Sequence, residues 1–275
     1  MKDKCTVCNS FIEELFKKKL LGKYTVNYYK CIHCGFLETD MPFWLEEAYN
    51  SPITNLDLGL LSRNIHYSKT VEEIISRMPI DINAKFIDYG GGYGVFVRLM
   101  RDKGFDFFRQ DLYCQNLFAN YFDITNLPAN SKFEILTAFE LFEHLEDPYL
   151  ELNKMFSLSD TIIFSTLLQP LTELENWWYL APETGQHISF YTKKALETIS
   201  DKNGCFLYSN NNDLHIFSKT KILQDPFSDM NLQSNSIFDK IIRTSKVLNK
   251  TRSSLLQKDF NFVLSKVRDN YENSI

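Results

Sequence analysis

A short apolar strand, a glycine-rich turn and an amphipathic helix follow one another within residues 85–100. The turn carries glycine at alternate positions, Gly90, Gly92 and Gly94, shortly after Asp88. Glycine has no Cβ, so such a turn lets the backbone bend sharply and approach a ligand of the nucleotide type. The strand before the turn and the helix after it supply the context that this motif requires. The segment therefore predicts an α/β fold with a cofactor-binding loop.

Two other glycine loops fit this segment less well. A phosphate-binding P-loop ends in Gly-Lys-Ser or Gly-Lys-Thr, and Gly94 is followed by valine instead. An NAD-binding loop has the form Gly-x-Gly-x-x-Gly, and here the third glycine comes one residue early. The NAD-binding loop stays the main alternative at this point.

Further strands alternate with helices after the loop. We expect a helix over 149–156, strands over 105–110, 133–138 and 161–165, and a final antiparallel hairpin of 205–209 and 213–218. This alternation predicts a mostly parallel sheet with helices on both faces, a Rossmann-like arrangement with an antiparallel last strand.

Two carboxylates follow strands of this predicted sheet. Asp111 lies at the tip of the second strand, where a carboxylate is placed to accept hydrogen bonds from a ribose diol. Asp123 comes after the next short segment. For either residue the alternative is a helix cap or a solvated turn.

Four of the six cysteines form two Cys-x2-Cys pairs separated by 22 residues. Two such turns can point four thiolates at one tetrahedral zinc ion. The segment between the pairs alternates like a strand over 23–30, and Gly35 follows the second pair where the turn favours a positive φ. We predict a structural zinc ribbon, against the alternative of unrelated thiols; its ligands are Cys5, Cys8, Cys31 and Cys34.

Composition narrows the environment of the chain. The start has no apolar signal segment, and no stretch reaches the roughly 18 apolar residues that span a bilayer. We therefore expect a cytoplasmic protein without a membrane span, in which Cys114 and Cys205 are small apolar residues with free thiols. A net charge of -5 disfavours nucleic acid as a partner.

The remaining segments are expected to be helical. Residues 70–73 have the form of a capping box, which predicts that a helix begins at Thr70. Two apolar stripes near the C-terminus predict helices that pack on the α/β domain, cap its ligand site or mediate self-association to a homo-oligomer. They consist of Ile237, Phe238, Ile241, Ile242 and Leu248, and of Leu255, Phe260, Phe262, Val263, Leu264 and Val267.

Several side chains of the segment before the glycine loop could line a substrate mouth, with linker packing as the alternative. They are Trp44, Tyr49, Arg63, His66 and Tyr67.

Four motifs occur along the chain in the order that is typical of a known enzyme family. They are Asp-x-Gly-x-Gly-x-Gly, the acidic strand tip, the Glu-His-Leu-x-Asp-Pro run at 143–148 and the Gly-Gln-His-Ile-Ser-Phe run at 185–190. Over about residues 1–220 the chain resembles a class I S-adenosylmethionine-dependent methyltransferase. With its four-cysteine segment it resembles, more narrowly, bacterial methyltransferases of nucleotide-linked sugars and surface-polysaccharide precursors.

The resemblance implies a domain order and cofactor contacts. It implies a zinc ribbon at 1–40, a helical bridge at 41–80, a cofactor-binding domain at 81–220 and a helical extension at 221–275. The methionine portion of S-adenosylmethionine would contact Asp88, Gly90, Gly92, Gly94, Phe139 and Glu140. Asp111 would hold the ribose and Asp123 the adenine amino group.

The resemblance also implies two candidate catalytic residues, His187 and His144, since an imidazole pKa near 6.5 suits proton transfer. In the similar sugar C-methyltransferases a Tyr-x-Glu-His run takes part in acid–base chemistry, and here the Tyr and Glu positions are Thr184 and Gln186. Glutamine cannot act as a base. The chain is also too short for their third domain, so we expect O-methylation of a small sugar or nucleotide-linked acceptor in capsule polysaccharide biosynthesis.

His187 is the stronger candidate of the two histidines. It lies beyond the fifth strand, at the sheet edge where open α/β sheets bind ligands. The aromatic run 177–179 stands just before it as an acceptor wall, with a packed core as the alternative. Three other functions stay open: sugar C-methylation, ribosomal RNA base methylation by a zinc-containing enzyme, and a non-catalytic scaffold on the same fold.

Overall fold

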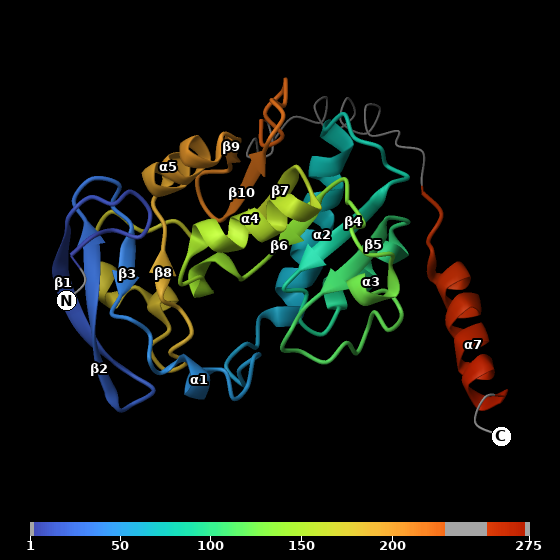
Figure 1. Ribbon diagram of the computed structural model, residues 1–275, viewed down its shortest axis with the longest axis horizontal. Helices are drawn as coiled ribbons and strands as arrows, with labels where there is room; N and C mark the ends of the chain where they lie inside the picture. Colours follow the sequence, from blue (N-terminus) through green and yellow to red (C-terminus); the bar gives the residue numbers. More distant parts are fainter. Residues whose placement is uncertain (1–2, 229–251, 273–275) are drawn as a thin grey trace, which may run out of the picture. The chain divides into compact units, whose positions relative to one another are not determined.

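The computed structural model describes residues 3–228 and 252–272 (Figure 1). Its strands form a four-stranded sheet of order β1-β2-β3-β8 and a six-stranded sheet of order β5-β4-β6-β7-β10-β9. The strands are β1 (Ile12–Leu20), β2 (Tyr24–Cys31), β3 (Leu37–Thr39), β4 (Lys85–Tyr89), β5 (Asp106–Gln110), β6 (Leu136–Ala138), β7 (Thr161–Ser165), β8 (Ser189–Phe190), β9 (Phe206–Ser209) and β10 (Leu214–Ser218).

The helices connect these strands. The α-helices are α1 (Leu45–Ala48), α2 (Leu60–Arg77), α3 (Val95–Asp102), α4 (Pro148–Leu158), α5 (Lys193–Asn203) and α7 (Leu256–Glu272). Short 3-10 helices are η1 (Ile124–Asn126), η2 (Phe142–His144), η3 (Leu174–Asn176) and η4 (Trp178–Leu180). Each described helix is too short or too polar to cross a lipid bilayer.

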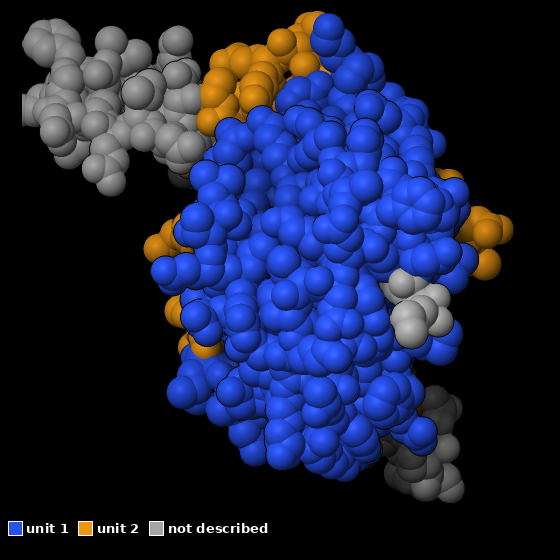
Figure 2. All heavy atoms as spheres, turned by 90° about the vertical axis from the view of Figure 1, so that its left-hand side faces the viewer, with its two compact units in different colours: residues 1–58, 112–114, 135–221 blue, residues 59–111, 115–134, 222–275 orange. Residues whose placement is uncertain are grey.

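The chain divides into two compact units built from interleaved segments, coloured in Figure 2. Unit 1 comprises 1–58, 112–114 and 135–221, and unit 2 comprises 59–111, 115–134 and 222–275. The four linear domains expected from the sequence stay a prediction.

The pairing of the six-stranded sheet confirms the predicted fold class. In unit 2, β4 pairs with β5 in parallel, and in unit 1 β6 pairs with β7 in parallel. Strand β10 runs antiparallel to both β7 and β9, which is the predicted closing hairpin. The central residues of β4 and β7 are buried, as expected for strands that are covered on both faces.

The sequence analysis predicted one strand of the four-stranded sheet, the segment over 23–30 that corresponds to β2. Strands β1 and β2 form an antiparallel hairpin, and β3 pairs antiparallel with β2. The fourth strand, β8, comes from far along the chain and pairs with β3 through Leu37 and Phe190. The cysteine-bearing segment therefore shares its sheet with the residues that directly follow His187.

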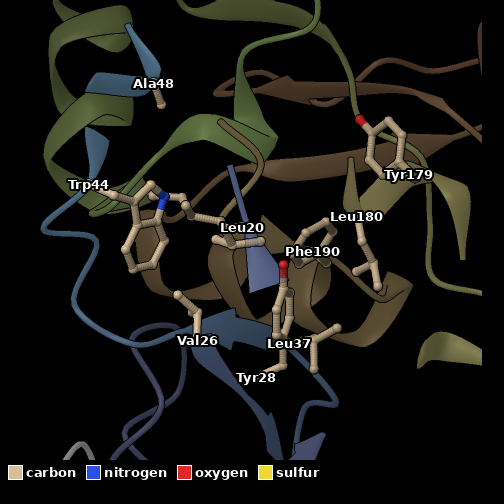
Figure 3. Packing of buried hydrophobic residues seen from close by; sticks show 10 residues of the cluster. Leu20, Val26, Tyr28, Leu37, Trp44, Ala48, Tyr179, Leu180 and Phe190 are labelled. Carbon is tan, nitrogen blue, oxygen red and sulfur yellow. The ribbon is translucent and has the colours of Figure 1, made fainter. Parts of the chain in front are cut away.

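A buried apolar cluster of unit 1 joins these segments (Figure 3). Trp44 is almost completely buried and donates a hydrogen bond from Nε1 to the carbonyl oxygen of Gly185 over 2.8 Å. The ring of Tyr179 lies on the same cluster, whereas Trp178 is exposed. The aromatic run 177–179 is thus divided between the core and the surface.

The predicted start of the helix before the glycine loop is wrong. Helix α2 begins at Leu60, so Thr70 lies inside the helix. Its hydroxyl donates to the carbonyl oxygen of His66, four residues back, instead of capping a helix start. Threonine makes either bond, so a Thr-x-x-Glu pattern does not by itself fix where a helix begins.

The structure describes only the second of the two predicted C-terminal apolar stripes. The stripe from Ile237 to Leu248 lies outside the described residues. The second stripe falls largely on α7, where the carboxylate of Asp259 is buried and holds Arg101 of α3 with hydrogen bonds of 2.8 Å. Within unit 2, α7 thus packs on α3.

Candidate active site

The sulfur atoms of the four paired cysteines come together in unit 1. All four lie within 4.8 Å of one another. The Sγ atoms are 3.6 Å apart for Cys5 and Cys34 and 3.3 Å apart for Cys8 and Cys31. In a tetrahedral site with zinc–sulfur bonds of about 2.3 Å, neighbouring sulfurs are about 3.8 Å apart. The cluster therefore fits a zinc ion with four thiolate ligands.

The backbone of the two cysteine turns is equivalent. Asn9 follows the first pair with φ 63° and Gly35 follows the second with φ 73°. Backbone N–H groups of His33 and Cys34 both donate to Cys31 Sγ over 3.4 Å, as in a turn that wraps one thiolate. A Cβ on Gly35 would meet Thr192 Cγ2 at 3.0 Å, so glycine also allows close packing there.

Hydrogen bonds between the thiols favour ionisation of one member of each pair. The hydrogen bond from the Cys34 thiol lowers the pKa of Cys5. Burial raises the pKa of Cys8, but hydrogen bonds from Ser10 and Cys31 outweigh it and lower that pKa to about 6. Thiolate is the form that binds metal, but the hydrogen bond with Cys5 raises the pKa of Cys34 and burial raises the pKa of Cys31, so only Cys5 and Cys8 are favoured as thiolates.

The glycine loop of unit 2 has the backbone that its sequence predicts. Gly90, Gly92 and Gly94 have φ values of 71°, 52° and 85°. The N–H groups of Gly90 and Gly91 donate to the carbonyl oxygen of Gln110 over 2.8 and 3.1 Å, which ties the loop to the end of β5. Because no side chain projects from these glycines, the loop fits close approach of a cofactor.

Gly91 adds a second reason for glycine in this loop. A Cβ there would lie 2.9 Å from Asp88 Oδ2 and 3.1 Å from Arg109 Cγ. The buried carboxylate of Asp88 therefore sits directly under the loop, in the place where it can orient it.

Arg109 is the residue of this site that the sequence analysis missed. It is buried within β5, donates from Nε to the Gly92 carbonyl oxygen over 2.6 Å and pairs with Asp123 over 2.7 Å. A third contact brings its guanidinium within 3.6 Å of Asp111. An arginine directly after the two phenylalanines of β5 was the available signal, since a buried charge needs partners.

Both predicted carboxylates lie beside this arginine. Asp111 accepts a hydrogen bond from the Gly92 N–H over 2.8 Å, so it fixes the loop. Asp123 begins η1 with a capping box, in which its backbone N–H donates to Asn126 Oδ1 over 3.0 Å. The structure thus brings Asp111 and Asp123 together around Arg109, and Asp123 has the helix-cap role that was its alternative.

The two candidate histidines face each other in unit 1. The ring centroids of His144 and His187 are 4.9 Å apart, and the ring planes are perpendicular at 90°. Nδ1 of His144 lies 3.0 Å from the Gln186 carbonyl oxygen, and Nδ1 of His187 lies 2.7 Å from the Tyr179 carbonyl oxygen. The sequence places these histidines 43 positions apart, and the fold makes them one site.

Two tyrosines extend this site within unit 1. The ring of Tyr49 lies 6.2 Å from that of His144 and stacks on Tyr113, with centroids 6.1 Å apart. Tyr113 is 74% exposed, so the aromatic surface reaches solvent. Tyr49, one of the side chains that the sequence analysis proposed for a substrate mouth, thus lies beside the histidines.

A family model described as a methyltransferase domain matches residues 63–210, which is more than half of the chain. The chain belongs to this methyltransferase family. The prediction of an S-adenosylmethionine-dependent methyltransferase is confirmed, and the NAD-binding alternative is set aside. No curated protein matches the sequence.

Several solved structures are similar to this methyltransferase at low identity. OxaC is 16% identical over 56% of this chain and 47% of its own, with a TM-score of 0.43. The magnesium protoporphyrin IX methyltransferase of Synechocystis PCC 6803, solved with bound SAH, is 15% identical. The match covers 63% of this chain and 90% of that enzyme, with a TM-score of 0.41. An O-methyltransferase family protein from Burkholderia thailandensis is 10% identical over 59% of each chain, with a TM-score of 0.40. This chain spans about half the length of OxaC, and identities this low say nothing about the acceptor.

Burial sets the protonation of His144 and Tyr179 in this methyltransferase. Burial, and then the charge of His187, lowers the pKa of His144 to about 3, so its imidazole is neutral at physiological pH. Burial, followed by the charge of Glu143, raises the pKa of Tyr179 well above its ordinary value. Tyr179 is thus a neutral phenol beside the site.

The segment after β6 holds an unusual backbone. Glu140 has φ 50° although it is not glycine, a conformation that costs free energy and clusters at functional sites. Its N–H donates to Ser165 Oγ over 2.8 Å, and that hydroxyl donates back to Glu140 Oε1 over 2.9 Å. Phe139 and Glu140 belong to unit 1, whereas the glycine loop belongs to unit 2.

Proposed function

We propose that this methyltransferase transfers the methyl group of S-adenosylmethionine to a hydroxyl oxygen of a small glycosyl or nucleotide-linked precursor of a capsule or other surface polysaccharide. The observation that carries the proposal is the facing pair of His144 and His187. The stacked rings of Tyr49 and Tyr113 beside it are suited to the apolar face of a sugar or the plane of a base.

The reaction is an in-line displacement at the methyl carbon. A lone pair of the acceptor oxygen forms the new carbon–oxygen bond while the sulfur–carbon bond breaks, and its electrons return to sulfur to leave neutral S-adenosylhomocysteine. The hydroxyl proton must leave as the oxygen bonds to carbon. His187 is proposed to deprotonate or position that hydroxyl, with His144 as the second candidate.

The cofactor contacts are a proposal of the same kind. Gly90, Gly92 and Gly94 would lie beneath the methionine portion, with Asp88 under the loop. Asp111 would hold the ribose hydroxyls while it keeps its bond to Gly92, and Asp123 would lie near the adenine. Phe139 and Glu140 would flank the methionine end. Bound S-adenosylmethionine supplies the electrophilic methyl group, and these residues bind and orient it.

We also propose that Cys5, Cys8, Cys31 and Cys34 hold a structural zinc ion. The sulfur separations and the two equivalent turns support it. Four thiolates leave no open position, so the ion would contribute folding free energy rather than chemistry. A cytoplasmic location follows from the proposed nucleotide-linked acceptor.

The side chain of Gln186 supports oxygen over carbon as the methylated atom. Its amide donates to the carbonyl oxygens of Ala48 and Ser51 over 2.9 and 3.1 Å, so it holds the chain rather than acting on an acceptor. The similar C-methyltransferases have a glutamate at this position. A net charge of -5 likewise disfavours a ribosomal RNA substrate.

An acceptor screen tests the proposal. The full-length protein is incubated with S-adenosylmethionine carrying a 13C-labelled methyl group and a panel of nucleotide sugars, sugar phosphates and nucleosides. We expect methyl transfer to at least one sugar acceptor, with the methyl carbon at a chemical shift typical of a methyl ether. Labelling of carbon, of nitrogen or of added ribosomal RNA alone would overturn it, and failure of S-adenosylmethionine to bind in a calorimetric titration would favour the scaffold.

A further inference from the structure

We infer that Glu143, His144 and His187 form a second metal site, which takes a first-row divalent cation and holds the acceptor hydroxyl. The inference rests on the proposed function for its acceptor. One potential ligand atom from each of the three residues lies within 4.8 Å of the others. Ligands of a bound ion at about 2.1 Å are roughly 3 to 3.4 Å apart, so small side-chain rotations would complete the site.

The hydrogen bonds of the two imidazoles orient them as metal ligands. A carbonyl oxygen can only accept, so Nδ1 of His144 donates to Gln186 and Nδ1 of His187 donates to Tyr179. In each neutral ring the lone pair is then on Nε2. Metal-binding histidines are commonly fixed in this way, by donating the other ring N–H to a backbone carbonyl.

The burial of the three residues suits a cation with open positions. The side chain of Glu143 is fully buried, whereas His144 and His187 are half-buried. A carboxylate taken out of water is stabilised by an adjacent positive charge. The half-buried imidazoles leave one side of the cluster accessible, where an acceptor oxygen could bind the ion.

The donor set selects the class of metal. Two imidazoles and one carboxylate suit Mn2+, Fe2+, Co2+ or Zn2+, whereas Ca2+ and Mg2+ prefer oxygen ligands alone. The four-cysteine cluster offers only sulfur, which Mn2+ binds poorly. Mn2+ is therefore a probe that distinguishes the two sites.

With a cation bound, His187 would act on the acceptor through the metal ion. As a ligand through Nε2 it would position the hydroxyl by way of the cation, which lowers the pKa of that hydroxyl by Lewis-acid polarisation. The proton then passes to solvent, the carbon–oxygen bond forms, and the sulfur–carbon electrons return to sulfur as before. His187 is thus assigned as a positioning residue, not as the base.

Mn2+ binding to the full-length protein tests this site. The protein is treated with a mild chelator, its zinc content is measured, and Mn2+ is titrated in while free Mn2+ is followed by electron paramagnetic resonance. We expect roughly one Mn2+ per chain, with affinity at least about tenfold weaker in His187→Ala and in Glu143→Gln. The matched control is His66→Ala, an exposed histidine of α2 that should bind Mn2+ like the unaltered protein.

The outcomes separate this inference from the proposed function. Mn2+ binding that is absent, or that is equal in all four proteins, overturns the metal site, even if methyl transfer to a sugar occurs. Mn2+ binding that depends on Glu143 and His187 supports the site even if every sugar acceptor fails. Since Glu143 is buried, far-ultraviolet circular dichroism and the zinc content of each variant establish that it has folded, and His187→Gln provides a second test at the half-buried position.

Discussion

The guanidinium of Arg109 donates from Nε to the carbonyl oxygen of Gly92 over 2.6 Å, so a side chain of β5 holds the glycine loop from below. The same guanidinium pairs with Asp123 over 2.7 Å and approaches Asp111 at 3.6 Å. One buried cation thus links the loop to both carboxylates that the sequence predicts at the cofactor site.

Arg109→Met is expected to lower the free energy of unfolding by about 3 to 5 kcal/mol, because it leaves buried carboxylates without their cation. S-adenosylmethionine affinity should fall with it, since the loop loses its support. Urea unfolding and calorimetric titration measure the two effects. Lys103→Met is the control: its partner Glu72 is 42% exposed, so loss of that ion pair should cost less than about 1 kcal/mol. Equal effects of the two substitutions would contradict this account.

Gly92→Val should weaken S-adenosylmethionine binding while the zinc content stays unchanged. A β-branched side chain resists the φ of 52° found there and would project where the cofactor is proposed to lie. Gly22→Val is the matched control, since Gly22 also has a positive φ of 70° but has open space around it. Calorimetric titration should show a loss for Gly92→Val only, and unchanged binding in both variants would remove the loop from the cofactor site.

His187→Ala should lower the methyl-transfer rate by roughly 100- to 10000-fold, the range typical for loss of a group that deprotonates or positions the acceptor hydroxyl. Cofactor affinity should stay nearly constant, because His187 is not among the proposed cofactor contacts. Turnover of labelled S-adenosylmethionine measures the rate, with Lys103→Met, which removes only the ion pair with Glu72, as the control. Near-normal turnover of His187→Ala together with an inactive His144→Ala would reverse the roles of the two histidines.

Removing one cysteine of the sulfur cluster should release zinc and unfold its segment. Cys31→Ser deletes the thiol that accepts two backbone N–H groups, so we expect the metal content to fall from about one zinc per chain to near zero. Elemental analysis of protein purified without chelators gives the number. Cys205→Ser is the control because Cys205 lies outside the cluster. Protein that contains no zinc before any substitution would exclude the metal.

Stability should fall as the pH drops because of His215 in β10. Burial lowers its folded-state pKa from 6.5 to about 4, while its Nε2 donates to the Thr166 carbonyl oxygen over 3.0 Å. The unfolded state therefore takes up a proton first as the pH falls below 6.5, and the loss continues until the pH passes the folded-state pKa. Between about pH 7.5 and pH 4.5 this group alone should remove about 2.5 kcal/mol of stability.

His215→Gln removes the titration at this position and checks the assignment. Its free energy of unfolding, measured with urea at both pH values, should depend less on pH than that of the unaltered protein. An identical pH dependence in the two proteins would show that His215 does not titrate on unfolding.

The sequence by itself determined the features that depend on local spacing. Glycine permits the positive φ that other residues resist, so the alternate glycines Gly90, Gly92 and Gly94 identified the loop before any contact was known. The two Cys-x2-Cys turns identified the sulfur cluster, because each turn can direct two thiolates at one ion. The alternation of strands and helices determined the parallel sheet, because a parallel strand needs a helical crossover before it can pair again.

Only the tertiary structure decided which distant side chains share a site. Leu37 pairs with Phe190 across more than 150 residues, and His144 meets His187 and Tyr49 from separate segments of unit 1. Arg109 meets Gly92 and Asp123, which lie 17 and 14 positions away along the chain. The sequence shows each of these residues alone, whereas their contacts follow from how buried apolar surfaces pack. That packing minimises a free energy of the whole chain, which no local pattern contains.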